Sequence, residues 1–185
     1  MNLSVYPRKC QALEQVFEDA KNAKEVLIVV LDTAKSIHVG RICDGEGRYL
    51  HRRPFNVKNN KDGIIYLTNR IEKEREKLGI DRSQVIVAME DPPHYVTNFA
   101  NRLSDLRYLV VRVNAFGASR KRKSNRISSD TSALDGICLM VMDRQAYELG
   151  PECGPFAELR LAAKTRRRLV RTETAVKNMI HRSLE

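Results

Sequence analysis

The chain of 185 residues carries 33 Lys and Arg against 23 Asp and Glu, a formal net charge of +10. This length suffices for one domain with its own hydrophobic core and a small appendage. The charge favours a polyanionic partner such as nucleic acid, although a basic protein without such a partner would show it too. No apolar stretch is long enough to span a membrane, and four cysteines without a C-x-x-C pair favour reduced thiols, so we expect a cytoplasmic protein with no membrane contact.

The first part of the chain predicts a helix followed by three antiparallel strands. Residues 9–22 have the apolar spacing of a helix, and residues 26–31 form an unbroken apolar run typical of a strand buried on both faces. Residues 36–43 alternate as a second strand does. The sequence DGEG at 44–47 predicts a hairpin turn, which would lead into a third strand at 48–55.

The rest of the chain alternates helices and strands. The expected elements are, in order, an amphipathic helix at 59–78, a buried strand at 84–90, a helix at 94–106, a strand at 108–114, a basic polar loop at 115–130, an apolar helix at 131–145 and a long basic helix at 156–185.

This order of elements predicts an α/β protein of the RNase H-like class. We expect a mixed five-stranded sheet with its first strand in the centre and helices on both faces. Residues 1–148 would form this domain, and residues 149–185 would form a separate, basic C-terminal helix.

Two acidic residues stand at the ends of strands that would be neighbours in such a sheet. Asp32 follows the first strand and Glu90 ends the fourth. Two close carboxylates repel each other unless a cation neutralises them, and carboxylate oxygens suit Mg²⁺ or Mn²⁺. Such ions serve phosphodiester chemistry by activating a nucleophile and stabilising the leaving oxygen. Asp130 and Asp135 could complete the set; alternatively, Asp32 merely ends its strand and Asp130 caps a helix.

Three segments resemble the transposases of the insertion-sequence 110 family, which includes the Piv DNA invertases. The stretch DTAK that begins at Asp32 is similar to the family's first acidic motif. Glu90, His94 and Tyr95 resemble the second motif, although Asp-Pro-Pro replaces its usual Pro-Thr-Gly. The strand YLVVRVN resembles the family's third segment, with Ala115 in place of a proline. The resemblance runs from about residue 25 to the end of the chain.

The family's last motif, D-x-x-D-A at the head of a helix, is only partly present. Aligning Asp135 with its second acid puts Ser132 in the position of the first, and Asp130 two residues earlier. Residues three apart share a helix face, whereas residues five apart do not, so Asp130 would have to reach the site from the preceding loop. The resemblance implies a catalytic and metal-binding set, with Mg²⁺ or Mn²⁺ as cofactor, of Asp32, Glu90, Asp135 and Asp130.

The resemblance implies the RuvC-like DEDD domain of a DNA transposase or recombinase, which cleaves and transfers strands when an insertion sequence moves. In that family a coiled-coil segment joins this domain to a second one with a nucleophilic serine, and a structured bridge RNA guides target choice. Residues 149–185 resemble the start of the coiled-coil segment, and no serine-containing domain or nucleophile is expected in this chain. DNA, a guide RNA and further copies of the chain are the expected partners.

Two basic segments are the expected contacts to the nucleic-acid backbone, since Lys and Arg bind phosphates independently of sequence. Alternatively, the first is a solvated loop and the second a helix packed on its own domain. Apolar residues at helical spacing in the second segment favour self-association through a coiled-coil seam. The expected nucleic-acid-binding residues are Arg120, Lys121, Arg122, Lys123 and Arg126 in the loop, and Lys164, Arg166, Arg167 and Arg168 in the helix.

Two other functions are compatible with this sequence. A catalytically incomplete module that binds nucleic acid and dimerises would account for Ser132 and for the missing serine domain. A Holliday-junction resolvase of the RuvC type would act alone through a metal-activated water, and cleavage of a four-way junction would identify it.

Overall fold

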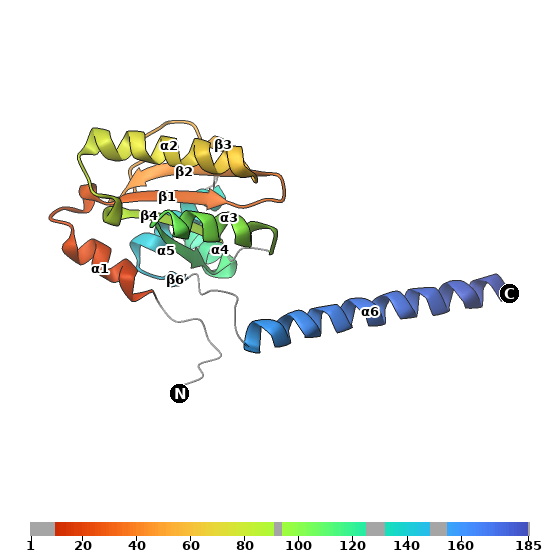
Figure 1. Cartoon of the computed structure of the whole chain (residues 1–185). Coiled ribbons are helices and arrows are strands. Elements are labelled where there is room, and N and C mark those ends of the chain that lie inside the picture. Colours follow the sequence, from red (N-terminus) through yellow and green to blue (C-terminus); the bar gives the residue numbers. More distant parts are fainter. Residues whose placement is uncertain (1–9, 91–93, 125–131, 149–154, 185) are drawn as a thin grey trace. The chain divides into compact units, whose positions relative to one another are not determined.

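The computed structural model describes residues 10–90, 94–124, 132–148 and 155–184. The chain forms two compact units, Met1–Leu149 and Gly150–Glu185. The first unit contains a mixed sheet with helices on both faces, and the second contains one long helix (Figure 1).

The strands are β1 (Leu27–Asp32), β2 (Ile37–Asp44), β3 (Phe55–Lys58), β4 (Val85–Glu90), β5 (Leu109–Val113) and β6 (Tyr147–Glu148). The helices are α1 (Gln11–Asp19), α2 (Lys61–Leu78), α3 (His94–Asp105), α4 (Ala115–Ser124), α5 (Ser132–Met142) and α6 (Pro155–Leu184), with short 3-10 turns at Ala23–Glu25 and Arg82–Gln84.

The strand order in the sheet is β3-β2-β1-β4-β5-β6. β1 is central, with β2 antiparallel on one side and β4 parallel on the other, and β5 continues parallel to β4. The apolar residues of β1 and β4 are fully buried because both strands lie mid-sheet between two layers of helices. This topology agrees with the RNase H-like class that the order of elements predicts.

The sheet has six strands rather than the five predicted. The sixth, β6, has two residues and pairs antiparallel with Val111 and Arg112 of β5. A strand this short cannot show an alternating apolar pattern, so the sequence pattern does not predict it.

The predicted third strand at 48–55 is present only in part, as a single antiparallel bridge between Tyr49 and Cys43 and as Phe55, the first residue of β3. The turn itself forms, with the Asp44 carboxylate accepting backbone N–H groups, but β3 starts at Phe55 and pairs with the first half of β2. Phe55 and Val57 are the residues of β3 that enter the core. The preceding stretch, HRRP, has no apolar side chain to bury and carries a proline, so the chain crosses it without regular pairing.

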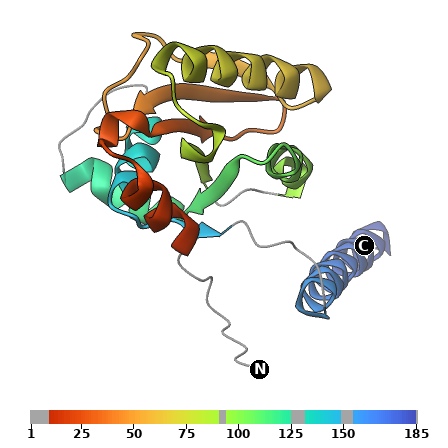
Figure 2. The ribbon, with the colours of Figure 1, turned by 60° about the vertical axis from the view of Figure 1, so that its left-hand side comes forward.

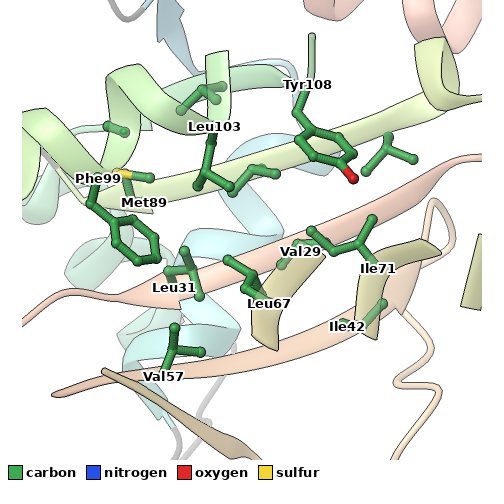
Figure 3. Packing of buried hydrophobic residues seen from close by; sticks show 14 of the residues in the cluster. Val29, Leu31, Ile42, Val57, Leu67, Ile71, Met89, Phe99, Leu103 and Tyr108 are labelled. Atoms are coloured by element: carbon green, nitrogen blue, oxygen red, sulfur yellow. The ribbon is translucent and has the colours of Figure 1, made fainter. Parts of the chain in front are cut away.

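One face of the sheet is covered by α2 and α3. Leu67 and Ile71 of α2 and Leu103 of α3 are fully buried there. They pack on the odd-numbered residues of β1 and β4, such as Val29 and Met89 (Figure 3). α2 is capped by the Asn60 side chain at its start and ends at a left-handed glycine, so both its ends are fixed. This side of the sheet is a largely apolar core, with His38 and Glu74 as buried polar residues among those described.

The other face is covered by α1, α4 and α5, so that the sheet lies between two helical layers (Figure 2). Val30 of β1 and Ala88 of β4 pack against Leu134 and other residues of α5. α5 also lies very close to α4: a Cβ on Gly136 would stand 2.6 Å from the carbonyl oxygen of Ala118. Glycine is therefore required where these two helices meet.

The second unit is α6, a helix of 30 residues. It carries exposed large apolar side chains along its length, namely Leu159, Leu169, Val170, Val176, Met179 and Ile180. Among the residues described, no helix is both long and apolar enough to cross a membrane.

Candidate active site

Asp32 and Glu90 come together because β1 and β4 run parallel and in register. Leu31 pairs with Met89, and each acid is the next residue of its strand. Neighbouring strands lie roughly 4.8 Å apart, so the carboxyl ends of the two strands place both acids side by side at one edge of the sheet. Both side chains are half-buried.

Both acids belong to the face that α4 and α5 cover. Side chains alternate along a strand, and Val30 and Ala88, two residues before the acids, pack in the cluster under α5. Asp32 and Glu90 therefore emerge on that same side. The apolar face under α2 and α3 contributes no part of this acid pair.

The two carboxylates influence each other. Burial raises the pKa of Glu90, and the charge of Asp32 raises it further. The charge of Arg122, from α4, acts in the opposite direction. Because the two carboxylates repel each other, a cation bound between them would stabilise their ionised forms.

The loop after Asp32 is fixed by polar contacts. The backbone N–H of Ala34 donates to Nδ1 of His38 (3.2 Å), and the Asn59 side chain donates to the carbonyl of Lys35 (3.1 Å). Burial lowers the pKa of His38, which favours the neutral imidazole that this acceptor role requires. The same ring packs edge-on against Phe99 of α3, at 4.7 Å between centroids. His38 thus connects the segments that follow β1 and β4, a role that a lone histidine without ligand spacing does not reveal in the sequence.

Asp135 lies on the same face but is held by other partners. The Tyr49 hydroxyl donates to its carboxylate, and Nη1 of Arg41 lies 3.6 Å from the same oxygen. The Arg41 guanidinium in turn stacks on the Tyr49 ring, at 3.4 Å from its centroid. Burial and the bond to Asp135 both raise the pKa of Tyr49, so the phenol stays a donor. Neither Arg41 nor Tyr49 was among the residues expected at the site.

Within the described ranges, no three His, Cys, Asp or Glu side chains gather closely enough to share a metal ion. The acid pair of Asp32 and Glu90 is adjacent, and Asp135 is engaged by Tyr49 and Arg41. Asp130 and Arg126 lie outside the described residues, and so does the side chain of Ser132.

The basic loop predicted at 115–130 is wrong for its first ten residues, which form α4. The Asn114 side chain caps this helix by accepting from the N–H groups of Phe116 (2.9 Å) and Gly117 (3.2 Å). Ala, Arg and Lys all favour helices, so the segment needs no apolar face of its own to form one. Four of the expected nucleic-acid-binding residues lie on it, namely Arg120, Lys121, Arg122 and Lys123.

These four cations have different surroundings. Lys121 forms an ion pair with Asp143, Arg122 acts on Glu90, and Arg120 lies over the ring of Phe116. In α6, Arg166, Arg167 and Arg168 are exposed, and the side chain of Lys164 is not described. Through Arg122, α4 thus carries a positive charge that acts on one acid of the pair, Glu90.

Comparison with known proteins identifies the family. The model of the DEDD transposases of the insertion-sequence 110 type, described as a transposase, matches residues 29–185. The search among curated proteins found no match. The matched range begins within β1 and includes Asp32, all of β4 with Glu90, and α4, α5 and α6. Since the match covers most of the chain, the protein belongs to the insertion-sequence 110 family of transposases, enzymes that cleave and recombine DNA.

Proposed function

We propose that this protein performs metal-dependent DNA strand cleavage and transfer in transposition, with Asp32 and Glu90 as the first two metal ligands. The adjacency of these acids at the ends of paired parallel strands carries the proposal. Their oxygen atoms are hard donors. Burial and the charge of Asp32 together raise the pKa of Glu90, and bound Mg²⁺ or Mn²⁺ would relieve the repulsion between the two carboxylates.

Each residue near the pair has a task in this function. The bound ions would activate the attacking nucleophile and stabilise the leaving oxygen. Asp32 and Glu90 hold them, and His38 fixes the loop that follows Asp32. Arg122, on the helix beside the pair, is positioned to attract the phosphate of the strand to be cut.

Asp135 and Asp130 are proposed as the remaining ligands. α5 packs on the face from which Asp32 and Glu90 emerge, and Asp135 is in its first turn. Tyr49 and Arg41 keep the Asp135 carboxylate oriented until a cation competes for it. Asp130 would reach the site from the segment that precedes α5.

The proposed partners follow from charge and exposed apolar surface. The cations of α4 and the exposed arginines of α6 would bind DNA and a structured guide RNA. Leu169, Val176 and Ile180 lie at helical spacing and are 65%, 45% and 52% exposed, so α6 is proposed to join copies of the chain. Leu169→Glu should lower the mass measured by light scattering after size exclusion, whereas Asn178→Glu, the same new charge at an exposed position on the opposite side of the helix, should not.

Calorimetric titration of Mg²⁺ and Mn²⁺ tests the metal site. The parent chain should bind saturably, and Asp32→Asn or Glu90→Gln should reduce the affinity by at least about 100-fold, the upper range for loss of even an outer-shell partner. Glu74→Gln, which changes an acid paired with Lys77 on α2, is the matched control and should bind as the parent does. Cleavage of DNA carrying the insertion-sequence ends should fail in the same two variants.

A second candidate function is a nucleic-acid-binding and assembly module. The observation that favours it is the engagement of Asp135 by Tyr49 and Arg41, away from a three-acid cluster within the described residues. In this case the parent would bind DNA or RNA in a salt-dependent manner but would bind no metal cation. Asp32→Asn would then leave the affinity for nucleic acid unchanged.

A further inference from the structure

Among the described residues, the most exposed large apolar side chain belongs to α4, not to α6. Phe116 is 71% exposed at the first turn of that helix. Its backbone is fixed, because the Asn114 side chain caps its N–H and the next residue, Gly117, lies so close to Met140 that a Cβ there would stand 2.9 Å from the Met140 methyl. The ring is therefore held outward by a rigid support rather than left on a loose loop.

The surroundings of this ring are cationic. Arg120, one helical turn later, has its guanidinium carbon 5.9 Å from the ring centroid. Beside it is an open pocket of about 310 Å³, whose described lining is Gly117, Arg120, Lys121 and Gln145. Lys123 is exposed on the following turn. An apolar ring flanked by positive charge does not suit an apolar protein surface, but it does suit a planar ligand joined to phosphates.

We infer that Phe116 and Arg120 form a stacking platform for an unpaired DNA base, with Lys123 and the pocket beside Arg120 receiving the adjoining phosphate. Every base has a face that stacks on an aromatic ring or on a guanidinium, whereas duplex DNA hides these faces within the helix. Single-stranded rather than duplex DNA is therefore the ligand that fits. The inference deepens the proposed DNA-cleaving function and rests on it for the choice of DNA.

The position of the platform gives it a use. Arg122, which acts on Glu90, and Phe116, which faces solvent, belong to the same short helix. α4 thus carries both the cation that acts on Glu90 and the residues of the platform. A strand whose phosphate approaches Asp32 and Glu90 would have a neighbouring base within reach of Phe116, provided that this base is out of the duplex.

The absence of tryptophan from the sequence permits a direct test. Phe116→Trp in the full chain introduces one indole, which reports stacking by fluorescence quenching. Ile65→Trp, at a 57% exposed position of α2, is the matched control. Each is titrated with a DNA single strand of about 12 nucleotides, a length within the usual site sizes, with the same sequence as duplex, and with the RNA version.

The DNA single strand should strongly quench the fluorescence of Phe116→Trp, and the duplex should quench it little. The fluorescence of Ile65→Trp should respond to neither. Phe116→Ala should weaken single-strand binding by roughly 5- to 140-fold and leave duplex binding unchanged, because one stacked base contributes about that much. Arg120→Gln should weaken both.

Three results would overturn the platform: single-strand affinity unchanged in Phe116→Ala, quenching by the RNA strand alone, or a change of oligomeric state in Phe116→Ala, which would assign the ring to a protein contact. Retained duplex binding in these cases would leave the proposed DNA-cleaving function intact. If the parent bound neither DNA form, the DNA-binding role of α4 in the proposed function would fail as well.

Discussion

Two pairs of carboxylates on opposite sides of the sheet differ in how their charge is balanced. On α2, Glu72 lies 2.8 Å from Arg75 and 3.0 Å from Arg82. Burial tends to raise its pKa, but the Tyr108 hydroxyl and these arginines more than offset it, so the pKa of Glu72 is lowered. Glu74 behaves alike: burial opposes, but Lys77 and the nearby His51 lower its pKa.

Glu90, on the other side, has a raised pKa because burial and the charge of Asp32 act together. The difference separates structural acids from acids available for chemistry. Glu72 and Glu74 receive their counter-charges from the fold itself, and they strengthen it. For Glu90 the charge of Arg122 offsets the effects of burial and of Asp32 only in part, so a cation from solution would stabilise the ionised carboxylate. Asp135, held by Tyr49 and Arg41, stands between these two classes.

The largest expected effect on stability is that of Glu74→Gln. It should lower the free energy of unfolding by about 1–2 kcal/mol, because it removes the charge that faces Lys77 and His51 at a largely buried position, while solvent screens the exposed lysine. Urea unfolding measures this. Glu76→Gln, on the exposed side of the same helix, should change it by less than about 0.5 kcal/mol. A loss of the same size in Glu90→Gln would remove the distinction between the two pairs.

A smaller effect on stability is expected for Tyr49→Phe. This variant tests whether Asp135 is a structural acid or a metal ligand. Loss of the hydroxyl should cost about 1 kcal/mol of unfolding free energy, since Arg41 still faces the carboxylate. If Asp135 is a metal ligand, the lost orientation should also weaken Mg²⁺ or Mn²⁺ binding by about 10-fold, as loss of an outer-shell partner does. If stability falls but the affinity for the metal ion is unchanged, Asp135 is a structural acid like Glu72 and Glu74.

The smallest expected effect is on how the free energy of unfolding depends on pH, and it has opposite signs for Glu90 and Glu74. Because the pKa of Glu90 is raised on folding, its contribution to stability is present at low pH and is lost as pH rises through that pKa. Because the pKa of Glu74 is lowered, its contribution is present at neutral pH and is lost as pH falls.

Urea unfolding of the parent, Glu90→Gln and Glu74→Gln from about pH 4 to about pH 8, with metal chelated, compares the two slopes. As pH rises, the free energy of unfolding of the Glu90→Gln variant should increase relative to that of the parent. That of the Glu74→Gln variant should decrease relative to that of the parent. Slopes of the same sign would show that the two acids have similar environments.

Long apolar runs and turn residues made most of the fold predictable. The strands expected at 26–31, 36–43, 84–90 and 108–114 are confirmed as β1, β2, β4 and β5 within a residue at each end. Because their order and direction follow from the topology, the adjacency of Asp32 and Glu90 could be expected before any coordinates. Local pattern and topology together were sufficient for that pair.

The partners of Asp135 could not be predicted in this way. Tyr49 is 86 positions away in sequence, and it pairs with β2 only through a single bridge to Cys43, too short for any periodicity to indicate which way its side chain points. α4 was missed for another reason: its basic residues form no apolar stripe, and an amphipathic pattern is the main helix signal. The cap at Asn114 and the helix propensity of Ala, Lys and Arg were the signals available.

The parallel pairing of β1 with β4 has a consequence for how this protein can evolve. The separation of Asp32 and Glu90 is set by backbone hydrogen bonds between two strands, not by the shapes of the side chains beneath them. Core residues such as Val30 or Ala88 can therefore be replaced by other small apolar residues without changing the distance between the two acids. The placement of the two acids thus depends on the most constant dimension of a sheet, its interstrand spacing, while the surrounding helices stay free to diversify.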